Sequence, residues 1–151
     1  MNDAPYDPRL ITPKVYGDRR PVEGEVVALL HITFERRGLR LVQARSRAMR
    51  LNEIHELVMT DEEGAGPGEG ADGVSALAFF EVKRGGVAVV GDEVSVGGKI
   101  LGELAGFDMT HMPNHMNLVV KTKSLEDPSI RVGDPIVFRA RLDEETRYNT
   151  G

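Results

Sequence analysis

The segments after Gly73 constrain the fold most, because short apolar runs there are separated by turn-forming glycine, proline and aspartate residues. Apolar runs of this length between such turns are typical of the strands of a β-sandwich or a small barrel. Helices do not alternate with these runs, as they would in a doubly wound α/β fold. The expected strands lie at 74–82, 86–98, 99–107, 117–123 and 134–142. The sequence therefore predicts a mostly β fold.

The first half of the chain adds one clear strand and one ambiguous stretch. Residues 25–37, EVVALLHITFERR, are rich in β-branched and aliphatic side chains and predict a largely buried strand. In residues 39–60, apolar and polar residues first alternate, as in a strand, but other apolar residues recur at helical spacing. There we expect a strand at 39–44, a short helix or turn around 46–56, and a strand near 56–61.

A chain of 151 residues is most simply one domain. We expect a single small β-barrel over residues 22–145, with one short helix, followed by a tail at 146–151. Four prolines forbid a continuous helix in residues 1–21, which are predicted to form an extended arm over the domain or a neighbouring subunit. This arm is the reason for expecting a homo-oligomer. The glycine-rich tract at 61–73 cannot hold regular structure and is predicted to be a flexible hairpin tip.

Composition excludes several kinds of partner and site. The formal net charge of −5 gives no overall attraction for nucleic acid or an anionic membrane, so we expect neither as a partner. The absence of cysteine excludes disulfides, thiolate zinc sites and thiol nucleophiles. The N-terminal residues contain no long apolar segment, so we expect a cytoplasmic protein without a signal peptide or membrane anchor.

A weak internal repeat links two of the expected strands. VVGDEVSV at 89–96 and RVGDPIVF at 131–138 share an apolar residue, a Gly-Asp pair and alternating apolar positions. Glycine can take the positive φ of a tight turn, and the aspartate can accept hydrogen bonds from turn amides. The pattern resembles the GD motif of the cradle-loop β-barrels, a group that includes the barrel domain of translation factors, and this resemblance implies a fold. Two unrelated tight turns would produce the same pattern.

The segment FDMTHMPNHMN, residues 107–117, carries the candidate chemistry, because it holds two of the four histidines, His111 and His115. Imidazole gains and loses a proton near neutral pH. Either histidine could therefore act as general acid or base, with Asp108 fixing its tautomer. The hypothesis is a small-molecule enzyme of the lyase, isomerase or cyclase type.

Three neighbouring polar residues would bind the small-molecule ligand in this hypothesis. Asn114 and Asn117 could donate hydrogen bonds to a carbonyl or a developing oxyanion, and Thr110 could orient the substrate. The same residue types also build turns through local hydrogen bonds, so the segment could equally be a structural loop. A non-catalytic ligand-binding or assembly module is therefore the alternative class.

A metal site formed by Asp108, His111 and His115 is a further alternative. Two histidines four residues apart share an ion readily on a helix, where their Cβ atoms lie about 6 Å apart. On a strand about 13 Å separates them, which is too far. Pro113 disfavours helical geometry between them. We therefore favour no cofactor and keep a divalent transition metal as the alternative.

The longer stretch GDEVSVGGKILGELAGFDMTHMPNHMN, residues 91–117, resembles a group of small bacterial β-barrel proteins, themselves uncharacterised, that carry a THMPNHMN-type segment. The resemblance implies a shared site within residues 108–117 and no particular reaction.

Six arginines lie close together before this segment. They are Arg36, Arg37, Arg40, Arg45, Arg47 and Arg50. Guanidinium groups bind carboxylate or phosphate, so the run could hold an anionic substrate. Acidic residues follow closely, which also fits a salt-bridged surface or a subunit contact. His55 lies on an uncertain element within this part of the chain, and the sequence leaves its neighbours open.

Overall fold

A computed structural model describes residues 18–141. Its strands are β1 Val22–Phe34, β2 Leu39–Arg40, β3 Ser46–Met49, β4 Ile54–Thr60, β5 Gly70–Ala71, β6 Val74–Arg84, β7 Gly86–Val89, β8 Glu93–Val96, β9 Lys99–Asp108, β10 Asn117–Lys121 and β11 Pro135–Arg139. No residue in this range is helical. The described residues also contain no helix long and apolar enough to cross a membrane. The prediction of a mostly β fold is confirmed.

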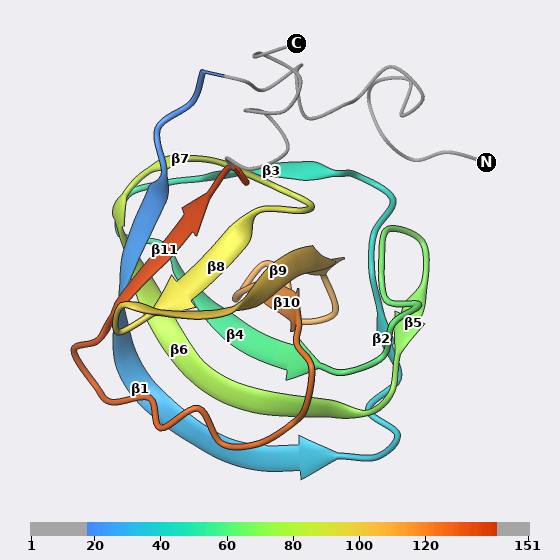
Figure 1. Cartoon of the computed structure of the whole chain (residues 1–151). Helices are drawn as coiled ribbons and strands as arrows, with labels where there is room; N and C mark the ends of the chain where they lie inside the picture. Colours follow the sequence, from blue (N-terminus) through green and yellow to red (C-terminus); the bar gives the residue numbers. More distant parts are fainter. Residues whose placement is uncertain (1–17, 142–151) are drawn as a thin grey trace, which may run out of the picture.

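Seven of the strands form one sheet that closes on itself (Figure 1). Hydrogen-bonded neighbours follow the order β1-β11-β8-β9-β10-β4-β6, and β6 also pairs with β1. Strands β10 and β4 run parallel, whereas the other neighbours in this sheet are antiparallel. The closure brings together β1 and β11, the first and the last strand of the described chain.

Side chains from alternate positions of the barrel strands fill its interior. Three fully buried phenylalanines, Phe80, Phe107 and Phe138, belong to this core, and the ring centroids of Phe80 and Phe138 lie 5.7 Å apart. Aliphatic residues from all seven barrel strands also belong to it. The interior is packed, as in other small barrels. Polar chemistry therefore has to lie outside it.

A second, smaller apolar cluster lies on the outer side of strands β4, β9 and β10. Residues that alternate with the inward positions of these strands are buried there. They are covered by residues 37–44 and 61–73, which together we call the flap. The cluster consists of Leu39, Leu41, Val58, Ala65, Ala71, Val74, Ala105 and Val119. One outer face of the barrel is thus covered by its own chain.

Of the short helix or turn expected around 46–56, the helix is wrong, and a turn is present at Leu51 and Asn52. Strand β3 occupies Ser46–Met49 and pairs with β7, and β4 begins at Ile54. The turn between β3 and β4 contains Asn52 with a φ of 73°. This left-handed backbone is incompatible with a right-handed helix passing through it.

Other expected strands are present with shifted bounds. The segment predicted at 25–37 corresponds to β1, which ends at Phe34. The strand predicted at 39–44 is reduced to the two residues of β2. The segment at 86–98 contains both β7 and β8, separated by a turn at Gly91.

Residues 1–17 of the predicted arm and the whole predicted tail at 146–151 lie outside the described residues. The glycine-rich tract at 61–73 connects the antiparallel strands β4 and β6, as expected of a hairpin tip. The expectation that the tract holds no regular structure is wrong at β5, which pairs with β2, and Ala65 and Ala71 are buried. These contacts join the tract to the rest of the flap.

The two Gly-Asp turns of the sequence repeat share one geometry. Gly91 and Gly133 have φ values of 97° and 95°, in the region that favours glycine. Asp92 and Asp134 each accept a hydrogen bond from the amide three residues earlier, at 3.0 and 2.9 Å. The strands that follow, β8 and β11, pair with each other. The repeat is therefore structural at its turns, and the resemblance to cradle-loop barrels stays a prediction.

Candidate functional site

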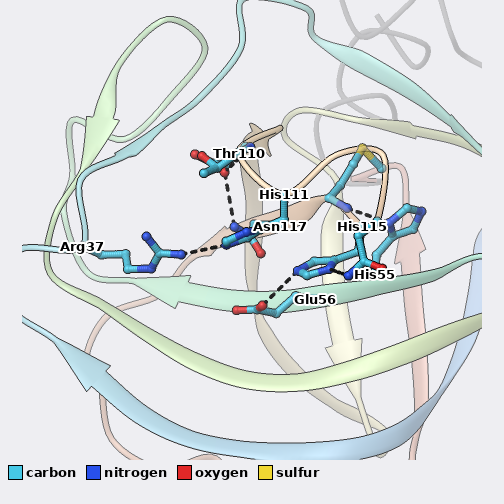
Figure 2. A network of polar contacts seen from close by, with 10 residues as sticks. Arg37, His55, Glu56, Thr110, His111, His115 and Asn117 are labelled. Atoms are coloured by element: carbon cyan, nitrogen blue, oxygen red, sulfur yellow. Dashed lines mark hydrogen bonds and ion pairs between the residues drawn. The ribbon is translucent and has the colours of Figure 1, made fainter.

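A row of three polar side chains crosses the outer side of the barrel. Glu56 on β4 is paired with Asn117 on β10, and Asn117 is paired with Asp108 on β9. Their neighbours along each strand belong to the inner core, so strand alternation directs these three outward. The loop between β9 and β10, residues 109–116, lies over the row, and Figure 2 shows the resulting polar network. The site therefore combines three strands and one loop.

Asp108 is fully buried and held by three donors. Its Oδ2 accepts a hydrogen bond from the Arg40 amide at 2.8 Å. Its Oδ1 accepts from the Thr110 amide at 3.0 Å and from Asn117 Nδ2 at 3.2 Å. Burial raises the pKa of Asp108, but the hydrogen bonds lower it more, so the pKa lies below its ordinary value. Asp108 is an ionised anchor for the start of the loop.

The predicted role of Asp108 as the orienter of a histidine does not match this geometry. Neither His111 nor His115 is among its hydrogen-bond donors. The carboxylate beside His115 belongs instead to Glu56, at 3.3 Å. No sequence pattern singled out Glu56, because it reaches the loop only through the parallel pairing of β4 with β10.

His115 is buried beneath the loop. Its Nδ1 lies 2.8 Å from Nδ2 of Asn114, and its Nε2 lies 3.3 Å from Oε1 of Glu56. The separation at Nε2 suits an ion pair, but the atoms are not aligned as a hydrogen bond, and Nε2 has no hydrogen-bond partner in the described chain. The ring meets Phe79 edge to face, with centroids 5.1 Å apart. Nδ1 therefore faces the exposed side-chain amide of Asn114, and Nε2 faces the partly buried carboxylate of Glu56.

His111 stacks on His115 and is held from the other side by an arginine. The two imidazole centroids lie 5.0 Å apart, with 28° between the ring planes. Nε2 of His111 lies 2.9 Å from Nη2 of Arg37. Because guanidinium can only donate, this nitrogen accepts, and the neutral ring carries its proton on Nδ1. The predicted convergence of the two histidines in a non-helical loop is present.

His55, whose place the sequence left open, is the third imidazole of the network. Its Nδ1 accepts a hydrogen bond from the Met116 amide at 2.9 Å, and its Nε2 lies 3.2 Å from Oε1 of Glu53. Burial lowers the pKa of His55, as do the positive charges of His115 and Arg47, against the raising effect of Glu53. His55 therefore favours the neutral form and ties the end of the loop to β4.

The three predicted substrate-binding residues are placed differently from one another. Thr110 and Asn114 are exposed on the loop. Asn117 is buried, and although its Nδ2 donates to Asp108, its Oδ1 has no hydrogen-bond partner in the described chain. Thr110 and Asn114 are therefore open to a ligand, whereas Asn117 belongs to the polar row beneath them.

The residues of the metal hypothesis do not form a ligand set. Within residues 18–141, no group of three or more histidine, aspartate and glutamate side chains is arranged to hold a metal ion. Both Asp108 oxygens accept hydrogen bonds from amides, and the rings of His111 and His115 lie face to face.

One family model matches this chain over residues 16–139, and its description is "Family of unknown function (DUF6917)". The match covers the barrel, the flap and the histidine loop. No curated protein and no solved structure gave a significant match. Because the model spans well over half of the sequence, the chain belongs to the DUF6917 family.

Proposed function

We propose that the protein is a small-molecule enzyme of the lyase, isomerase or cyclase type, in which His115 transfers a proton and Glu56 compensates its charge. The observation that carries the proposal is the state of His115 Nε2. This atom is buried, makes no hydrogen bond within residues 18–141 and lies 3.3 Å from a carboxylate oxygen of Glu56. A buried polar atom without a partner is unusual in a purely structural network and is more typical of a functional group.

The chemistry follows from the two sides of the ring. Because Nδ1 accepts a hydrogen bond from the side-chain amide of Asn114, the neutral His115 ring carries its proton on Nε2, toward Glu56. A substrate that displaces the exposed Asn114 side chain would meet the basic Nδ1. When Nδ1 takes a proton, the imidazolium lies beside the Glu56 carboxylate, which stabilises the positive charge. This is the arrangement of a general base with a charge-compensating partner.

His111 has a different role in this proposal. Its Nε2 accepts from Arg37, and its ring covers one face of His115. Together with the exposed Thr110, it would position the substrate rather than move the proton.

A non-catalytic ligand-binding module is the second candidate. It is supported by Asp108 and His55, whose polar atoms bind backbone amides and so brace the loop without offering reactive atoms. In that case the loop would hold a ligand without transferring a proton.

Proton exchange in D₂O tests the catalytic proposal without knowledge of the full reaction. The protein is incubated with small keto acids and hydroxy acids, and loss of the signal of the acidic C–H is followed by proton NMR. We expect the wild type to accelerate exchange in at least one compound and His115→Gln to reduce that rate by about a hundredfold or more. Absence of exchange across the panel, or equal rates in the variant, would contradict the catalytic role.

A stability comparison separates a catalytic from a structural histidine. His115→Gln removes no hydrogen bond at Nε2, so its unfolding free energy should stay within about 1 kcal/mol of the wild type. His55→Gln is the matched control, because it disturbs the bond from the buried Met116 amide and should be more destabilising. If His115→Gln unfolds as easily as His55→Gln, His115 is structural and the enzyme proposal fails.

A further inference from the structure

A pocket of about 480 Å³ opens beside the histidine loop, between the flap and β3. Its lining includes Arg40 and Arg47 and contains no aspartate or glutamate. Met109, the first residue of the β9–β10 loop, lines it as well, so the pocket and the loop share a wall. The protein carries a net charge of −5, which makes a cavity lined by two arginines and no acid a local exception.

The two guanidinium groups lack counter-ions in the described part of the chain. Other arginines are paired: Arg19 with Asp92, Arg84 with Glu23, and Arg141 with Glu103. Neither pocket arginine takes part in any such ion pair with a residue of 18–141.

Arg47 is the more informative of the two, because its Nε is buried and makes no hydrogen bond within residues 18–141. A buried donor without an acceptor destabilises the folded protein, and does so more when the donor carries a charge. An anionic ligand at this guanidinium group would supply an acceptor that residues 18–141 do not.

Backbone amides around the pocket add further hydrogen-bond donors, and hydrogen bonds within the chain hold this backbone in place. The amides of Gln43 and Ala44, which line it, donate to no acceptor among the described residues. Two hydrogen bonds hold the backbone that lines the pocket. The Arg40 amide donates to Asp108, and the Gly68 amide donates to the Leu41 carbonyl at 3.0 Å. The pocket is therefore preorganised by the flap and does not depend on the ligand for its shape.

We propose that this pocket binds a small oxyanion, a carboxylate or a phosphate group, through Arg40 and Arg47. Guanidinium groups bind both anions through paired hydrogen bonds. The volume lies within the range of about 300–1,000 Å³ that is usual for small-ligand sites. The proposal assigns Arg40 and Arg47, two of the six clustered arginines, to anion binding rather than to a salt-bridged surface or a subunit contact. It is independent of the acid–base proposal, because anion binding is measured without turnover.

An amide NMR titration tests the site with two probes, inorganic phosphate and succinate, added at constant ionic strength. We expect saturable shifts of the Gln43, Ala44 and Gly68 amides with at least one probe, and the tighter one identifies the preferred oxyanion. Arg47→Gln should weaken binding by about tenfold or more, since a hydrogen bond to a charged group contributes roughly 1.5–3 kcal/mol. Arg40→Gln should do the same, and because the Arg40 side chain is exposed this second variant keeps the test valid if Arg47→Gln unfolds.

Arg139→Gln on β11 is the matched control, because Arg139 is also an exposed strand arginine and does not line the pocket. Its affinity for both probes should equal that of the wild type. Unsaturable shifts with both probes, or equal weakening by Arg139→Gln, would overturn the proposal. Self-association of the wild type that disappears in Arg40→Gln, with no anion binding, would assign these arginines to a subunit contact instead.

Discussion

Replacement of Asp108 by asparagine tests whether the buried carboxylate anchors the histidine loop. Asparagine has nearly the same shape but keeps only one acceptor oxygen. If that oxygen takes the place of Oδ1, it retains the bonds from the Thr110 amide and from Asn117. The NH₂ group then faces the Arg40 amide, whose 2.8 Å bond to Oδ2 is lost. One hydrogen bond to a charged group contributes roughly 1.5–3 kcal/mol, so the unfolding free energy should fall by about that amount.

The assay is urea unfolding followed by circular dichroism at neutral pH. Asp61→Asn is the control, because Asp61 is exposed and makes no hydrogen bond with the described residues. A surface change of this kind should stay within about 0.5 kcal/mol of the wild type. If Asp108→Asn costs no more than the control, the three donors do not stabilise the fold and the loop is anchored by other contacts.

The difference in stability between the wild type and Asp108→Asn should also depend on pH. The pKa of Asp108 is lower in the folded protein than in the unfolded chain, because the hydrogen bonds outweigh the effect of burial. Its contribution is therefore present at neutral pH and is lost as the pH falls through the folded-state pKa. The stability difference between the wild type and Asp108→Asn should shrink in acid, and a difference independent of pH would contradict the cause given for the shift.

Two further predictions concern strand packing and the third histidine. A Cβ on Gly102 would lie 2.1 Å from the Lys121 carbonyl oxygen, so Gly102→Ala should lower the unfolding free energy by about 3 kcal/mol in the same urea assay. Gly64→Ala is the control and should be nearly neutral, because no atom of residues 18–141 lies within 4 Å of a Cβ there. Burial lowers the pKa of His55, so the unfolded chain takes up that proton at a higher pH than the folded protein, and stability should fall as the pH drops below about 6.5. His55→Gln should reduce this slope in urea unfolding between about pH 7 and pH 5, and an unchanged slope would show that another group causes it.

The strands could be predicted because their apolar pattern reports burial directly. The helix around 46–56 could not be excluded in this way, since five apolar residues there have helical spacing: Val42, Met49, Leu51, Ile54 and Leu57. Leu51 and Ile54 are 60% and 46% exposed, whereas Met49 and Leu57 are buried in the core, so the five positions do not form one buried helical face. Pairing of β3 with β7, some forty residues away along the chain, decides the conformation there.

The candidate site was predictable only in its local part. The loop at 107–117, with His111 and His115 in it, follows from the sequence, because turn residues and proline determine the backbone conformation of only a few neighbouring residues. Glu56 and His55 could not be assigned, because the parallel pairing of β4 with β10 joins segments about sixty residues apart. The sequence suggested Asp108 as the partner of an imidazole, but its hydrogen bonds across the sheet make it an anchor of the loop instead.

The closure of the sheet between β1 and β11 has a consequence for biosynthesis. One side of β1 can pair with β6 as soon as both have left the ribosome, but the other side has to wait for Pro135–Arg139. Until then, both β1 and β8 present open backbone edges, which other chains can bind. A chain that stops before β11 keeps these edges open permanently. The last described strand therefore covers the two edges at which the nascent protein would otherwise be exposed to edge-to-edge association.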